Sequence, residues 1–201
     1  GYREFNPKES YKAGDKIYWV NRKKAIIAST IGTKDLNEGL RMNGAHIDSP
    51  RLDLKPNPLY EKAEAAYFKT HYYGGIRKYQ WATIPLAMHG VVILKDGTLV
   101  DICIGEKEGD PVFCVTDLLP HLGKKQMEKR GNEVVEGEDL NILVGSIPLS
   151  GEEKEPVKKQ ILQLLKEKYN IEETDFISAE LEAVPAGNAR NYGLDESMIM
   201  G

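Results

Sequence analysis

The sequence predicts an α/β fold in which a sheet with buried strands is joined to a separate, mostly antiparallel β domain that carries helices. Residues 25–31 (AIIASTI) are apolar at nearly every position, which is typical of a strand buried on both faces of a helix-covered sheet. Four β-rich segments then follow at short spacing between residues 66 and 104, as in an antiparallel domain. Residues 156–169 carry apolar side chains at helical spacing, which predicts an amphipathic helix.

The N-terminal part is predicted to begin with a hairpin. Residues 16–20 and 25–31 are β-rich, and the polar residues 21–24 between them are typical of a turn. Residues 35–38 predict a short helical turn that ends at Gly39.

The character of the chain changes at Pro56-Asn57-Pro58. Two prolines in three residues stiffen the backbone where it leaves the N-terminal part, because proline fixes its own φ and restricts the residue before it. We therefore expect a domain boundary here. Asp96-Gly97 is a strong signal for a two-residue hairpin turn. The strands predicted around that turn and before it cover residues 66–73, 81–86, 90–94 and 99–104.

Residues 116–130 predict the first helix of the C-terminal part. Thr116 and Asp117 can cap its start, and Pro120 is tolerated in a first turn. Gly131-Asn132 is expected to close it.

The second helix, residues 156–169, is expected to stop at Asn170 in the left-handed conformation, with Ile171 folding back on the last turn. Residues 177–184 then alternate between two faces, which predicts a half-buried strand.

Composition and charge exclude several classes of function. The 201 residues are 41% hydrophobic and 29% charged, which is ordinary for a globular protein. The formal net charge of −4 argues against a nucleic-acid-binding protein, which usually shows a basic face. The longest apolar stretch, residues 84–94, is too short for a membrane span, which takes about 20 residues. Two cysteines, Cys103 and Cys114, argue against a disulfide framework and indicate a reducing, cytoplasmic location.

The chemistry of the chain is expected at residues 44–50 (GAHIDSP). The small residues before His46 indicate the end of a buried strand, which the Ser-Pro pair terminates. Side chains two residues apart in a strand share one face, so we expect His46 and Asp48 on the same side and Ile47 in a core. An imidazole that donates one nitrogen to a carboxylate keeps the other nitrogen free for a metal. A His–Asp hydrogen bond with a structural role alone is the alternative interpretation.

Residues 46–52 (HIDSPRL) resemble the first metal motif of the aspartyl aminopeptidase/aminopeptidase I family of dinuclear zinc exopeptidases. Further segments resemble later parts of the same family in the same order, so the resemblance covers roughly residues 11 to 201. Tyr73-Gly74-Gly75 with Trp81 is similar to the family's entry into its dimerisation domain. Residues 119–122 (LPHL) are similar to its Pro-His-Leu segment. Residues 180–186 and 195–201 are similar to its return into the catalytic domain.

This resemblance implies a metallo-aminopeptidase that hydrolyses the N-terminal residue of peptides with metal-activated water and two Zn²⁺ ions per active site. His46 would ligate one metal, and Asp48 would hold its imidazole. His121 would reach from the dimerisation domain into the partner subunit's active site, where it would stabilise the reacting carbonyl oxygen. The family also implies a homo-oligomer built from dimers, expected to be a dodecamer, with no nucleic acid and no membrane as a partner.

The resemblance also divides the chain into three parts. Residues 1–56 would be the N-terminal part of a zinc-exopeptidase-type catalytic domain, residues 57–185 an inserted dimerisation domain, and residues 186–201 the return into the catalytic domain. The family's bridging Asp, its adjacent Glu pair and its final His have no counterparts here. We therefore expect an internal piece of a longer enzyme, inactive by itself.

Two other functions stay open from the sequence. The chain could be a non-catalytic dimerisation or interaction module, or another metallohydrolase that shares only the His-x-Asp strand and needs no role for His121. His71 and His89 are expected in packing or turn positions, and Glu180 and Glu182 on a solvent-exposed strand face.

Overall fold

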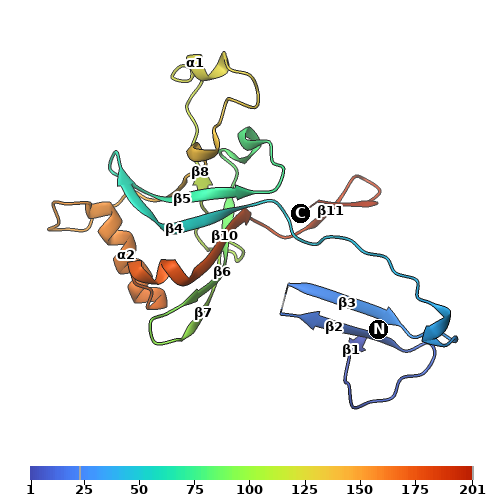
Figure 1. The fold of residues 1–201 in the computed structure, drawn as a ribbon. Helices are drawn as coiled ribbons and strands as arrows, with labels where there is room; N and C mark the ends of the chain where they lie inside the picture. Colours follow the sequence, from blue (N-terminus) through green and yellow to red (C-terminus); the bar gives the residue numbers. More distant parts are fainter. Residues whose placement is uncertain (23, 201) are drawn as a thin grey trace. The chain divides into compact units, whose positions relative to one another are not determined.

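The computed structural model (Figure 1) describes residues 1–22 and 24–200. The chain divides into two compact units, Gly1–Ser49 and Pro50–Gly201. Two residues of the predicted features, Lys23 in the first turn and Gly201 in the last segment, lie outside the described part.

The predicted boundary at Pro56–Pro58 is not where the chain divides. Strand β4 (Arg51–Lys62) runs through both prolines, because the pairing register shifts between Leu54 and Leu59 and the prolines lie within this irregularity. Residues 186–200 also stay within the second unit. The assignment of these parts to a catalytic and a dimerisation domain stays a prediction.

The first unit is built on a three-stranded sheet in the order β1-β2-β3. β2 (Lys16–Asn21) and β3 (Ala25–Thr30) form the predicted antiparallel hairpin, and β1 (Arg3–Glu4) adds in parallel to β2. The predicted helical turn is confirmed as η1 (Leu36–Glu38), which the Asp35 side chain caps.

Two predictions in this unit are wrong. β3 is exposed at every position instead of buried on both faces, because the described residues of this unit include no α-helix to cover the sheet. Residues 39–50 form no strand, and Ile47 is 63% exposed instead of packing in a core. No described strand of this unit offers Gly44–His46 a backbone partner, and an unpaired extended segment is not a strand.

The second unit contains a seven-stranded sheet in the order β7-β6-β10-β4-β5-β9-β8. All its neighbouring strands are antiparallel, as predicted. Besides β4, its strands are β5 (Ala65–Tyr73), β6 (Leu86–Ile93), β7 (Leu99–Ile104), β8 (Cys114–Val115), β9 (Ile142–Gly145) and β10 (Ala179–Pro185). A separate hairpin of β11 (Arg190–Tyr192) and β12 (Met198–Met200) follows.

The hairpin at Asp96-Gly97 is confirmed, with a longer loop than predicted. Gly97 N donates to Leu94 O, and Gly97 alone of the central pair has a positive φ, of 85°. The separate strands predicted over residues 81–86 and 90–94 are wrong. The chain forms η2 (Lys78–Trp81), turns at Thr83 with φ of 66°, and then runs as the single strand β6.

Helix α2 (Pro156–Tyr169) has the predicted bounds and packs against β4, β5 and β9 (Figure 1). Its N-terminus is held by Glu61 of β4, whose Oε2 accepts from the backbone N–H of Val157 at 2.9 Å and of Lys158 at 3.0 Å. Asn170 is left-handed and Ile171 N donates to Leu165 O, as predicted.

The helix predicted over residues 116–130 is wrong, since only α1 (Lys124–Met127) forms there. Pro120 lacks an N–H and Gly123 favours non-helical backbone, so the helix begins only after Gly123. Two further short helices, η3 (Gly137–Asp139) and η4 (Glu173–Ser178), complete the unit.

The core lies between one face of the large sheet and α2 with η4. Phe68 of β5 meets Phe176 of η4 edge to face, with ring centroids 5.6 Å apart. On β10 the alternation predicted from the sequence buries Leu181 and Ala183, whereas Ile177 belongs to η4 and is 67% exposed. Among the described residues, no helix has the length and apolar character needed to cross a membrane.

Candidate functional site

His46 and Asp48 contact each other, as the sequence predicts. His46 Nδ1 lies 3.3 Å from the Asp48 carboxylate oxygen Oδ1 and 3.1 Å from the Asp48 backbone oxygen. The contact does not need a strand, because the irregular backbone of residues 39–50 brings the two side chains together locally. Ser49 and Pro50 then lead into β4.

The geometry of this pair fits a histidine that binds a metal. A neutral ring that donates from Nδ1 to Asp48 keeps the lone pair of Nε2 free, and neutral imidazole is a common zinc ligand. The His46 side chain is 86% exposed, so Nε2 is open to an incoming ion. The pair can offer one nitrogen ligand, with a carboxylate beside the ring. Within residues 1–22 and 24–200, no three His, Cys, Asp or Glu side chains gather into a metal site.

His121 lies in the second unit, in the turn between β8 and α1. The turn is closed by hydrogen bonds from Leu122 N and Gly123 N to Leu119 O, both of 2.9 Å. The segment extends away from the edge of the sheet that β8 forms (Figure 1). His121 is exposed, and so are the apolar side chains beside it, Leu118, Leu119 and Leu122. Exposed apolar side chains close together are typical of an interaction surface.

The other two histidines have partners within the second unit. His71 stacks on Tyr72 with ring centroids 5.6 Å apart. His89 of β6 is half-buried, and its Nε2 lies 2.7 Å from Glu106 Oε1. The second oxygen of Glu106 accepts from Gly187 N at 3.3 Å. This hydrogen bond links the loop after β7, which contains Glu106, to the segment after β10. Both histidines therefore take the packing roles expected of them.

A row of polar side chains crosses one face of the large sheet, and sequence reasoning missed it. The row follows the pairing register through five neighbouring strands, since residues paired across antiparallel strands share a face. Its members, from β5 to β7, are His71, Asp53, Glu182, His89 and Cys103. Glu182 was expected to be merely solvated, but it is part of this row. The residues come from distant parts of the chain, so only the pairing register brings them together.

Arg51 pairs with both acidic members of this row. Its Nε donates to Asp53 Oδ1 at 2.7 Å and lies 3.2 Å from Glu182 Oε1, while its guanidinium carbon lies 4.0 Å from the centre of the Tyr73 ring. Burial by itself lowers the pKa of Arg51, but the hydrogen bond to Asp53 and the charge of Glu182 outweigh it and raise the pKa. Arg51 is thus shared between two carboxylates that stand on neighbouring strands.

Comparison with known proteins identifies relatives along the whole chain. A family model described as aminopeptidase I zinc metalloprotease (M18) matches residues 1–201. A Clostridium acetobutylicum protein with the name Probable M18 family aminopeptidase 1 is 60% identical over 194 residues, which make up 96% of this chain.

Solved structures of such proteins share the fold. The crystal structure of an M18 family aminopeptidase from Thermotoga maritima is 53% identical, covers 92% of this chain and superposes with a TM-score of 0.84. That of aminopeptidase I from Clostridium acetobutylicum is 61% identical, covers 94% and has a TM-score of 0.82. The more distant mApe1 dodecamer of S. cerevisiae, 18% identical with a TM-score of 0.57 over 98% of this chain and 44% of its own, has the same fold. These likenesses confirm the predicted α/β class with its antiparallel sheet.

The chain spans about two fifths of the relatives it matches. The shared stretch makes up 42% of the Clostridium acetobutylicum protein and 41% of the Thermotoga maritima structure.

Proposed function

Because this chain belongs to the aminopeptidase I zinc metalloprotease family, M18, we propose that it supplies the first zinc ligand and an interface histidine of an aminopeptidase. The proposed reaction is hydrolysis of the N-terminal residue of peptides. The observation that carries the proposal is the contact of His46 Nδ1 with Asp48, which leaves Nε2 of an exposed ring available.

His46 would hold zinc through Nε2, and Asp48 would fix the tautomer and the direction of the ring. When bound, zinc would supply Lewis acidity and lower the pKa of water to about 7. Two Zn²⁺ ions per active site are part of the proposal, supported by the likeness of residues 46–52 to a dinuclear metal motif. A stable zinc site takes three or four protein ligands, so we expect the 201-residue chain alone to bind zinc weakly and to lack peptidase activity.

We assign His121 a role in a partner subunit's active site, as a hydrogen-bond donor to the reacting carbonyl oxygen. The support is its position on a segment that extends from the sheet with exposed Leu118, Leu119 and Leu122 beside it. A two-fold interface places the same patch on both subunits, so each histidine can serve the other chain. The proposed assembly is a homo-oligomer built from dimers, and the mApe1 relative is a dodecamer.

We also propose a cytoplasmic location. Cys103 and Cys114 are both free thiols, and unpaired cysteines are characteristic of reducing compartments.

A chimera tests the proposed function. Residues 1–201 of this chain replace the matched stretch of the Clostridium acetobutylicum relative, to which they are 60% identical. We expect the chimera to release the N-terminal residue from an aminoacyl-nitroanilide, to lose this activity to a chelator and to regain it with added zinc. The unmodified relative is the control for assembly and rate.

A chimera that folds and assembles like the relative but does not hydrolyse the substrate would contradict the proposal. For the isolated 201-residue chain, calorimetry with zinc is the matching measurement, and tight stoichiometric binding would show that its residues form a complete site.

A further inference from the structure

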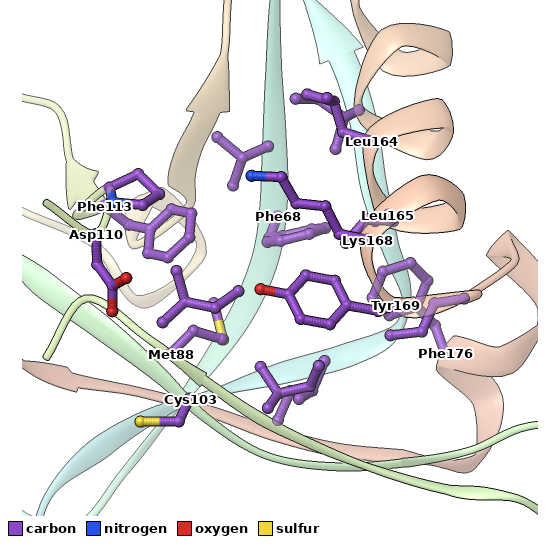
Figure 2. A pocket seen from close by; sticks show the side chains of 17 residues that line it. Phe68, Met88, Cys103, Asp110, Phe113, Leu164, Leu165, Lys168, Tyr169 and Phe176 are labelled. Carbon is purple, nitrogen blue, oxygen red and sulfur yellow. The ribbon is translucent and has the colours of Figure 1, made fainter. Parts of the chain in front are cut away.

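A pocket of about 200 Å³ lies between α2 and the large sheet (Figure 2). The buried part of its lining comes from the sheet, from η4 and from the segment that follows α2. These buried residues are Phe68, Met88, Ile102, Ile171, Phe176 and Leu181. The pocket belongs entirely to the second unit and includes neither His46 nor His121.

The size and lining of the pocket limit what it can hold. An apolar cavity of about 150 Å³ accommodates benzene, whereas pockets for drug-sized ligands start at about 300 Å³. A volume of about 200 Å³ therefore suits one phenyl ring or a chain of roughly six to eight carbons. The apolar lining would stabilise such a group by removing its surface from water.

Two polar groups at the end of α2 border this apolar space. Figure 2 shows the Tyr169 hydroxyl and the Lys168 side chain extending from the helix toward the pocket. The other lysines of α2 pair with carboxylates: Lys158 with Glu173, Lys159 with Glu152 and Lys166 with Glu172. Within the described chain, Lys168 Nζ and Tyr169 Oη have no such protein partner. Both can therefore donate a hydrogen bond to a ligand.

Asp110 borders the pocket on the side away from α2 (Figure 2). Its Oδ2 accepts from the backbone N–H of Lys107 and of Gly105, each at 3.2 Å. These two hydrogen bonds lower the pKa of Asp110 below its ordinary value, which already makes the group a carboxylate at neutral pH. An anionic ligand group is repelled from that side and attracted to the ammonium of Lys168.

We propose that this pocket binds a small amphipathic monocarboxylate. The apolar body would fill the space among Phe68, Met88 and Phe176, and the carboxylate would accept hydrogen bonds from Tyr169 Oη and Lys168 Nζ. This site is separate from the proposed peptidase chemistry, and its test does not depend on enzyme activity.

The test uses the 201-residue chain labelled with ¹³C at its methionine methyl groups and titrated with octanoate. Met88 is 3% exposed and lines the pocket, whereas Met42 and Met127 are 86% and 72% exposed and serve as internal controls. We expect the Met88 methyl resonance to shift saturably while the Met42 and Met127 resonances stay in place. Octanol, which lacks the charge, should bind about tenfold more weakly, because a hydrogen bond to a charged group is stronger than a neutral one.

Two matched substitutions identify the donors. Lys168→Gln should weaken octanoate binding about 5- to 10-fold, and Tyr169→Phe about 2- to 10-fold. Lys166→Gln, on the same helix but paired with Glu172, should leave the affinity unchanged. Circular dichroism of each variant confirms that the helix is intact.

Three results would overturn the proposal. They are an unshifted Met88 resonance at millimolar octanoate, equal affinity for octanol and octanoate, and equal affinity of Lys168→Gln and Lys166→Gln for octanoate.

Discussion

Arg51 of β4 and Glu182 of β10 form an ion pair between two neighbouring strands of the seven-stranded sheet, with Arg51 Nε 3.2 Å from Glu182 Oε1. Asp53 stands directly opposite Glu182 in the pairing of β4 with β10, so the arginine separates two carboxylates that would otherwise repel each other. The ion pair lies between residues that are far apart in the sequence, and it joins β10 to β4 where Glu182 pairs with Asp53.

We expect Arg51→Met to lower the free energy of unfolding by about 1–3 kcal/mol, because two partly buried carboxylates lose their common partner. Urea denaturation measures the change. Adding Glu182→Gln to Arg51→Met should recover part of the loss, since it removes the repulsion. Glu138→Gln is the control: it breaks an ion pair with Lys55 but leaves stability unchanged, because the Glu138 side chain is 83% exposed. An Arg51→Met variant as stable as the parent chain would contradict this role.

Gly90→Ala should destabilise the sheet by more than about 3 kcal/mol. Gly90 has a φ of 134°, and a Cβ at this position would overlap the backbone carbonyl oxygen of Glu180 on β10. A backbone atom in the middle of a sheet cannot move aside without breaking the ladder. Gly131→Ala is the matched control, because the space around Gly131 is open. Thermal unfolding followed by circular dichroism should separate the two variants, and a small shift for Gly90→Ala would show that β6 and β10 can move apart.

Glu172 should make the free energy of unfolding depend on pH in the acid range. Hydrogen bonds from Lys95 and Lys166 lower the pKa of this carboxyl from 4.5 to about 2. Because the folded pKa is the lower one, the unfolded chain binds more protons in this window, and the stabilisation is present above pH 4.5 and lost as the pH falls toward 2.

The variant Glu172→Gln should therefore be less stable than the parent at pH 7, and the difference should shrink steadily as the pH falls toward 2. Denaturant midpoints measured from pH 7 to 2 at low salt give the difference, which added salt should reduce because the group is exposed. A difference that stays constant across this range would rule out the charge as its origin.

In the chimera, His46→Ala should remove one metal ion per subunit and most of the activity while leaving assembly intact. The loss of an exposed ligand does not disturb the core. Asp48→Asn should be milder, with a loss of about 10- to 100-fold in metal affinity or rate, because it changes the group that orients the ligand. Elemental analysis gives the metal content. Unchanged metal content and rate in His46→Ala would make His46 a structural residue.

His121→Ala should reduce the rate of the chimera by about 100- to 1,000-fold, the usual cost of losing a donor to the reacting oxygen. Mixing His46→Ala subunits with His121→Ala subunits tests the role across subunits. A mixed dimer should regain one working site, built from His46 of one chain and His121 of the other. Folded mixed assemblies without recovered activity would place His121 in the site of its own subunit.

Local signals in the sequence predicted local structure well. Helix α2 and strand β7 have the predicted bounds, because each carries a clear period and a stop signal, such as Asn170 after α2. The helix predicted over residues 116–130 failed because a capping pattern was weighed above Pro120 and Gly123, which prevent helix in the first half of that segment.

The candidate site was predictable in part, because one of its contacts is local in the sequence. His46 and Asp48 are two residues apart, so their contact could be read from the sequence even though the strand around them is absent. The partnership of Arg51 with Glu182 depends on the order of strands in the sheet, and no local pattern contains that order. The position of Lys168 at the border of the apolar pocket likewise depends on packing between distant segments.

The central place of β10 in the sheet also determines when the second unit can finish folding. Hairpins β4–β5 and β6–β7 each join neighbouring segments, so both can close soon after synthesis. The seam between them is filled only by Ala179–Pro185, which emerges from the ribosome after both hairpins are complete. Until then β4 and β6 each present an unpaired edge, which is the kind of surface that aggregates during translation. We therefore expect chaperones to be needed most by the nascent chain in the interval before residues 179–185 emerge from the ribosome.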